Sequence, residues 1–177
     1  MKRLFGLSNA AALFLLATPL AMASDAQTSA TAGSNSLRPH GTAAATARYE
    51  GQVGFARTQT QSGRVNLARG VAVGVDKQGL SLSVSHAVAP RLGPAVGSNF
   101  SLSIGRDGEV SKNHSIAVAR GPIEREVTVG GQAGSHRLGS TASGLASGRT
   151  DPFGRVQASS DSRVSRPLAR IARVLHR

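Results

Sequence analysis

The residues of this chain that could perform catalysis are few, and their spacing assembles no familiar active site. His86 and His114 project from the bulky face of two expected strands, on either side of Phe100. Neighbouring strands lie about 4.8 Å apart, which separates the two imidazoles by roughly 9–10 Å. That separation is too wide for one metal ion at ordinary ligand distances. We interpret the two histidines as part of a polar row near one end of a sheet.

A second candidate for chemistry is the pair Glu124 and Glu126, which share one face of a strand about 7 Å apart. Two carboxylates at that distance can act as general acid and base on a glycoside. However, the sequence places no aromatic platform for a sugar beside them. It also contains no G-x-S-x-G elbow, no phosphate loop and no H-E-x-x-H motif. We therefore expect a non-enzymatic protein with no catalytic residues, no metal ligands and no cofactor.

The strongest chemical signal is positive charge. The chain contains 21 Lys and Arg residues but only 9 Asp and Glu residues, which gives a formal charge of +12. Such a balance favours contact with anionic partners, or it only keeps the surface solvated. The arginines of the last segment recur every three or four residues, on the face opposite Leu168, Ile171 and Leu175. This pattern predicts a short basic amphipathic helix or tail over residues 163–177. The candidate anion-binding residues are Arg163, Arg166, Arg170, Arg173 and Arg177.

The elements that must position these side chains are β-strands, because bulky and small residues alternate with a period of two. Leu80-Ser81-Leu82-Ser83-Val84 is the clearest example. The fold class that this pattern predicts is mainly β, with an antiparallel meander of five or six strands within residues 49–130. The expected strands span residues 64–75, 80–88, 98–105, 109–119 and 123–129, with a sixth over 49–57.

The turns between these strands predict a register, because a one-residue slip would send every side chain to the wrong face. The loop Arg106-Asp107-Gly108 has a glycine where a left-handed residue is needed, and it closes with Gly105 opposite Glu109. The pairs that bring bulky residues opposite one another are Val75 with Leu80, Ile104 with Val110, Val84 with Leu102, His86 with Phe100, and Val118 with Ile123.

The two faces of the expected sheet differ sharply. The small face carries Ala, Ser and Gly, and we expect it to be solvated or to lie against something very close. The bulky face carries Val, Leu, Ile and Phe and should be covered, since an open apolar face binds a partner or aggregates. By parity Arg69, Lys112 and Arg125 also project from the bulky face, either with their charged ends in water or around a basic groove.

Residues 1–23 have the three parts of a secretory signal peptide: Lys2 and Arg3, an apolar run, and the cleavage site Ala21-Met22-Ala23. We expect cleavage after Ala23 and a secreted or periplasmic location. The chain has no cysteine, which fits an exported bacterial protein without disulfides. Residues 24–48 are poor in large apolar residues and are expected to be disordered, and residues 131–162 are expected to form a flexible Gly/Ser-rich linker.

One weak repeat links Asn99-Phe100-Ser101-Leu102-Ser103 to Asn113-His114-Ser115-Ile116-Ala117, fourteen residues later. These two stretches resemble the head repeats of trimeric autotransporter adhesins, with one residue inserted. The resemblance implies a β-roll as an alternative fold. Two copies fall short of the three or more units that a repeat fold needs.

Two functional classes follow from the sequence. The first is an exported envelope or extracellular protein with a structural, adhesive or protein-binding role, whose apolar face meets a second copy or another envelope protein. The second is a cationic protein that binds anionic polymers or membrane surfaces through its C-terminal arginines. No specific nucleic acid is expected as a partner. Salt separates the two classes, because charge-driven binding weakens steeply as salt rises.

Overall fold

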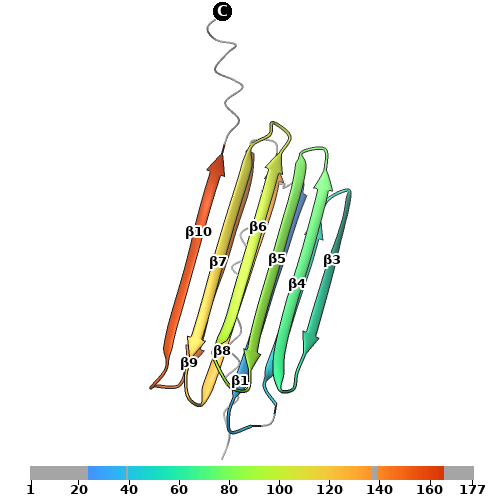
Figure 1. Ribbon diagram of the computed structural model, residues 1–177. Coiled ribbons are helices and arrows are strands. Elements are labelled where there is room, and N and C mark those ends of the chain that lie inside the picture. The colour runs from blue at the N-terminus through green and yellow to red at the C-terminus, as the bar shows by residue number, and fades with distance from the viewer. Residues whose placement is uncertain (1–23, 39, 137–138, 166–177) are drawn as a thin grey trace, which may run out of the picture.

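The computed structural model describes residues 24–38, 40–136 and 139–165, which form two antiparallel β-sheets packed face to face (Figure 1). The mainly β prediction is confirmed, and the described residues contain no helix and so none that could cross a membrane. The strands are β1 (Ser24–Asn35), β2 (Thr42–Glu50), β3 (Val53–Gln61), β4 (Val65–Asp76), β5 (Gly79–Pro90), β6 (Ala95–Gly105), β7 (Val110–Arg120), β8 (Glu124–His136), β9 (Gly139–Thr150) and β10 (Arg155–Ser165).

The larger sheet has the strand order β10-β7-β6-β5-β4-β3, and its middle is the predicted meander. The β4–β5 hairpin pairs Val75 with Leu80, and the β6–β7 hairpin pairs Ile104 with Val110, as the turns predicted. The link between β5 and β6 differs by two residues, because Val84 pairs with Phe100 instead of Leu102, and His86 with Ser98. A two-residue slip keeps each side chain on its face, so the alternation could not detect it.

The smaller sheet has the order β2-β1-β8-β9 and consists largely of segments that the sequence predicted to be disordered or flexible. Residues 24–48 form β1 and most of β2, and residues 131–162 contribute to β8, β9 and β10. Residues 163–165 end β10 and are not helical. The rest of the predicted C-terminal helix and the predicted signal peptide lie outside the described residues.

Two predicted connections are wrong. The chain crosses to the other sheet after β7, so β8 pairs with β1 and β9, and Val118 does not face Ile123. The expected strand over 49–57 is divided at residues 51–52 between β2 in one sheet and β3 in the other. The antiparallel pairing of every described strand also excludes a β-roll for the described residues.

The core lies between the sheets and is built from the small face. Its fully buried residues are mostly alanine and serine, with Val127 and Val129 as the largest apolar side chains. The backbones approach so closely that a Cβ on Gly70 would lie 2.6 Å from the carbonyl oxygen of Thr46, and one on Gly74 2.6 Å from that of Glu50. Small residues are therefore required on both inner faces, since larger ones would separate the sheets.

Hydroxyl groups link the two sheets across this narrow space. Thr28 Oγ1 of β1 lies 2.8 Å from Ser83 Oγ of β5, and Ser103 Oγ donates to the carbonyl oxygen of Gly134 at 2.7 Å. Ser111 Oγ donates in the same way to the carbonyl oxygen of Ser140 at 2.8 Å. Each buried hydroxyl of the described residues has a hydrogen-bond partner. A polar interior therefore costs little desolvation free energy.

The fourteen-residue repeat has a structural role in this interior. On β6, Ser101 Oγ donates to Asn99 Oδ1, and on β7 Ser115 Oγ donates to Asn113 Oδ1, at 3.1 and 2.9 Å. A Cβ on Gly131 would lie 2.1 Å from Asn99 Oδ1, and one on Gly144 would lie 1.9 Å from Asn113 Oδ1. Each repeat therefore inserts an asparagine opposite a glycine of the smaller sheet.

Candidate interaction surface on the outer face of the six-stranded sheet

The bulky residues of β3–β7 form the outer face of the larger sheet, which we call the apolar face. No described element covers it, which corrects the expectation that the bulky face would be the covered one. Strand register arranges its side chains in rows that run across the sheet. One row contains Val53, Val75, Leu80, Ile104 and Val110, and the next contains Phe55, Val73, Leu82, Leu102 and Lys112.

The apolar face is large for the surface of a single chain. Phe55 is 52% exposed, Phe100 39% and Ile116 38%, and their neighbours Leu82 and Val84 are half-buried among them. The five strands β3–β7 at about 4.8 Å and five rows at roughly 7 Å give an area on the order of 800 Å². The largest apolar patch of a typical monomer is about 300–600 Å², and a stable interface buries about 800 Å² per partner.

Basic residues interrupt the apolar face toward its middle rows. Arg69 and Lys112 are exposed there, as their parity predicted, and Arg69 is the register partner of His86. Burial, and secondarily the positive charge of Arg69, hold the pKa of His86 below its ordinary value of 6.5. A hollow of about 350 Å³ lies beside them between β3 and β4, lined by Phe55, Arg57, Thr58, Gln59, Arg69 and Val71.

Arg125 does not belong to this surface, contrary to its predicted parity on the bulky face. It is 4% exposed and lies between the sheets, where its guanidinium donates to the carbonyl oxygens of Gly121 and Arg91 and to Ser34 Oγ. The prediction failed because β8 belongs to the smaller sheet, and not to the meander. In the smaller sheet the odd-numbered residue Arg125 points toward the interior. Glu126 of the same strand is half-buried on the outer face of the smaller sheet instead.

Of the predicted anion-binding arginines, only Arg163 lies within the described residues. It is exposed on β10, and its Nε donates to Asp161 Oδ2 at 3.2 Å in an ion pair that is itself exposed to water. Arg166, Arg170, Arg173 and Arg177 lie outside the described residues. The described residues therefore do not test whether the five arginines form a cluster.

The outer face of the smaller sheet has a different chemistry. Its rows are made mainly of Thr, Ser, Gln and Gly, with few large apolar side chains apart from Leu145, which is 49% exposed. Asp25 is buried on this face, and burial raises the pKa of its carboxyl group although Gln27 and Gln132 donate to Oδ2. The two outer faces thus make the sandwich amphipathic, with one apolar side and one polar side.

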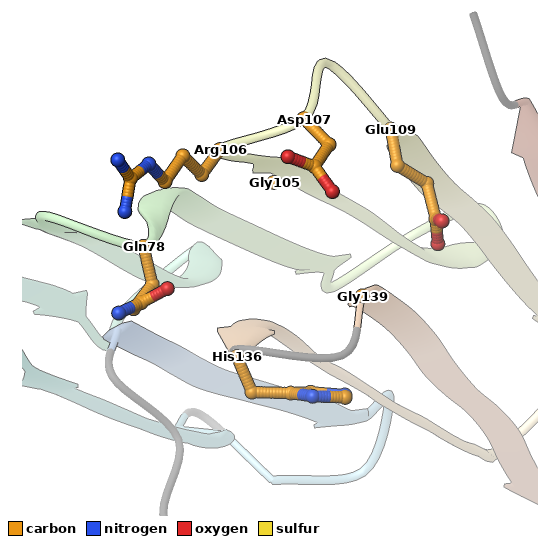
Figure 2. A pocket seen from close by; sticks show the side chains of 7 residues that line it. All are labelled: Gln78, Gly105, Arg106, Asp107, Glu109, His136 and Gly139. Atoms are coloured by element: carbon orange, nitrogen blue, oxygen red, sulfur yellow. The ribbon is translucent and has the colours of Figure 1, made fainter. Parts of the chain in front are cut away.

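A separate hollow of about 290 Å³ lies at one end of the sandwich, beside the β6–β7 turn. Figure 2 shows the carboxyl groups of Asp107 and Glu109 on one side of it and the ring of His136 on the other. Glu109 Oε1 accepts a hydrogen bond from the backbone nitrogen of Ser140 at 3.3 Å. No group of three potential metal ligands exists among the described residues, here or elsewhere. We interpret this hollow as part of the loop packing.

Comparisons of this chain with protein families, with curated proteins and with solved structures give no match. The geometry of the described residues therefore carries the functional argument.

Proposed function

We propose that this chain is an exported bacterial envelope or extracellular protein with a non-enzymatic structural, adhesive or protein-binding role. The single observation that supports this proposal is the apolar face, which leaves Phe55, Phe100 and Ile104 in water. The predicted signal peptide over residues 1–23 supports export. Burying an apolar area of this size against a partner is favourable, at about 25 cal/mol per Å² before the cost of association.

The test compares charges introduced on the two outer faces. Phe100→Lys places an ammonium group in the centre of the apolar face, and Leu145→Lys makes the matched change on the polar side. Each variant and the unchanged protein are immobilised, and the retention of envelope proteins is measured at low and high salt. We expect Phe100→Lys to weaken retention at least about tenfold, as loss of a central aromatic contact does, and Leu145→Lys to preserve it.

Salt decides between the two functional classes. Apolar association persists at high salt, whereas attraction between exposed charges is screened within about 8 Å at physiological ionic strength. Retention that disappears at high salt and is indifferent to Phe100→Lys would contradict the proposal. That result would favour the cationic binding of anionic polymers or membranes by the C-terminal arginines.

A further inference from the structure

The edge strands β10 and β3 stand at the two ends of the six-stranded sheet and each have one paired neighbour (Figure 1). All residues of β10 are exposed, and so are all residues of β3 except Gly54. On its other side, which no strand of the described residues pairs with, each presents a row of backbone N–H and C=O groups. Such an edge is a template for pairing with another strand.

The two edges carry exposed charges such as Arg57 and Asp161, but they lack the other features with which proteins block such pairing. Protected edges are short, or they have lysine, proline, a bulge or a charge pointing inward. β10 has no proline, and its register with β7 runs without a bulge from Arg155 opposite Arg120 to Ser165 opposite Val110. The inward positions of the two strands are all uncharged: Val156, Ala158, Ser160, Ser162 and Val164 on β10, and Gly54, Ala56, Thr58 and Thr60 on β3.

Strand direction permits the two edges to pair with each other in separate copies. Every neighbouring pair in this six-stranded sheet is antiparallel, so β10 and β3 run in opposite directions. A second copy shifted sideways by one sheet width would therefore continue the antiparallel alternation. This contact uses different surfaces on the two copies, so it does not close and produces an open chain of molecules.

The register of such a contact follows from the rows of the sheet. The row that begins at Val53 of β3 passes through Val75, Leu80, Ile104 and Val110 and ends at Ser165 of β10. Continuing this row without offset sets Ser165 of one copy opposite Val53 of the next. The antiparallel register then sets Arg163 opposite Phe55, Asp161 opposite Arg57, and Ser159 opposite Gln59.

This register is complementary in charge and in size. Asp161, which accepts a hydrogen bond from Arg163 of its own copy, also meets Arg57 of the next copy. Opposite charges directly across two strands stabilise the pair. Arg163 faces the ring of Phe55, which suits a guanidinium group. On the inner side, small residues meet small residues, with Ser160 opposite Thr58 and Ser162 opposite Ala56. Pairing β3 with itself about Arg57 would instead oppose two arginines, and pairing β10 with itself about Ser160 would leave Asp161 opposite Ser159.

We propose that copies of this chain assemble edge to edge, with β10 of one copy pairing antiparallel with β3 of the next and Asp161 opposite Arg57. The contact uses the sheet edges and is independent of the partner of the apolar face. The result is an extended filament with the apolar faces of successive copies on one side, separated by the polar outer residues of β10.

A charge-exchange experiment tests the pairing. Asp161→Arg and Arg57→Asp each create like charges across the contact, so each variant alone should remain monomeric by sedimentation velocity where the unchanged protein assembles. An equimolar mixture should assemble again, because every contact in an alternating chain then opposes Arg and Asp. Lys77→Asp, in the exposed β4–β5 turn, makes the same charge change as Arg57→Asp away from both edges and should assemble normally. Three results would each overturn the proposal: the unchanged protein is monomeric, a single variant assembles by itself, or the mixture of the two variants stays monomeric.

Disulfide trapping tests the register. Because the chain contains no cysteine, only the introduced cysteines can form disulfides. Directly opposite residues have Cα atoms about 4.5–5.5 Å apart, within the range that a disulfide spans. Ser159→Cys with Gln59→Cys should therefore give a ladder of linked multimers on oxidation. Ser159→Cys with Val53→Cys, three rows away, should give few. Within one molecule the two edges are separated by the full width of the sheet, so an internal bond cannot explain the ladder. Equal ladders from both pairs, or none, would contradict the proposed register.

Discussion

At the scale of single residues, the apolar face places a titratable group in an unusual setting. His86 lies half-buried between apolar neighbours and opposite Arg69. Burial and, to a lesser extent, Arg69 disfavour its charged form, so its pKa is lowered from 6.5. The unfolded chain therefore takes up a proton at this site before the folded chain does, and the free energy of unfolding must decrease as pH falls below 6.5.

We expect His86→Gln to remove this part of the pH dependence. The measurement is the urea midpoint as pH is lowered from neutral through 6.5, for the variant and the unchanged protein. As a second readout, Arg69→Gln should raise the pKa of His86 in an NMR titration, but only in part, since burial is the larger cause. A His86 pKa at or above its ordinary value would show that the apolar face is more open than described.

At the scale of elements, local sequence was most informative where a tight turn joins two strands. The β6–β7 loop closes as predicted: the nitrogen of Gly105 donates to the carbonyl oxygen of Glu109 at 2.8 Å, and Gly108 has a φ of 75°. Longer or sheet-changing links were predicted poorly. The link from Arg91 to Pro94 allowed a two-residue slip, and the link after Arg120 carried the chain to the other sheet. A tight turn determines its register by backbone geometry, whereas a longer link leaves it to packing.

Gly108→Val should therefore destabilise the protein by about 1–2 kcal/mol, because a β-branched residue tolerates a left-handed conformation poorly. Gly63→Val is the matched control in the β3–β4 turn, where a Cβ would meet no atom within 4 Å. We expect the control to change the free energy of unfolding by less than about 0.5 kcal/mol. Equal effects of the two substitutions on chemical denaturation would contradict the conformational explanation.

At the scale of the whole molecule, the sandwich reverses the usual distribution of side chains. Alanine, serine and glycine fill the space between the sheets, and most of the larger apolar residues lie on an outer face. Such an interior gains less from burial per residue than one of leucine and valine. It is held instead by close backbone packing and by hydrogen bonds between the sheets, such as that of Thr28 with Ser83.

Adjacent positions on β7 test this reversal. Ser115 is fully buried and donates to Asn113 Oδ1, whereas Ile116 is 38% exposed on the apolar face. We expect Ser115→Ile to cost about 2 kcal/mol or more by overpacking the narrow interior. Ile116→Ser should cost less than about 1 kcal/mol. An ordinary sandwich with its bulky residues inside would give the opposite order in thermal or urea unfolding, and that order would refute the described packing.

The sequence by itself determined the strand class, the alternation of faces and the register of the two tight hairpins, because these depend on neighbouring residues and on turn geometry. It did not determine which face becomes the core. The strands β1, β2 and β9 are too poor in bulky residues to signal burial, and they read as disordered or flexible segments. Only the tertiary structure shows that their small side chains let the two sheets approach until Gly70 nearly meets the backbone of Thr46. That close approach selects the small face as the interior and leaves the bulky face outside.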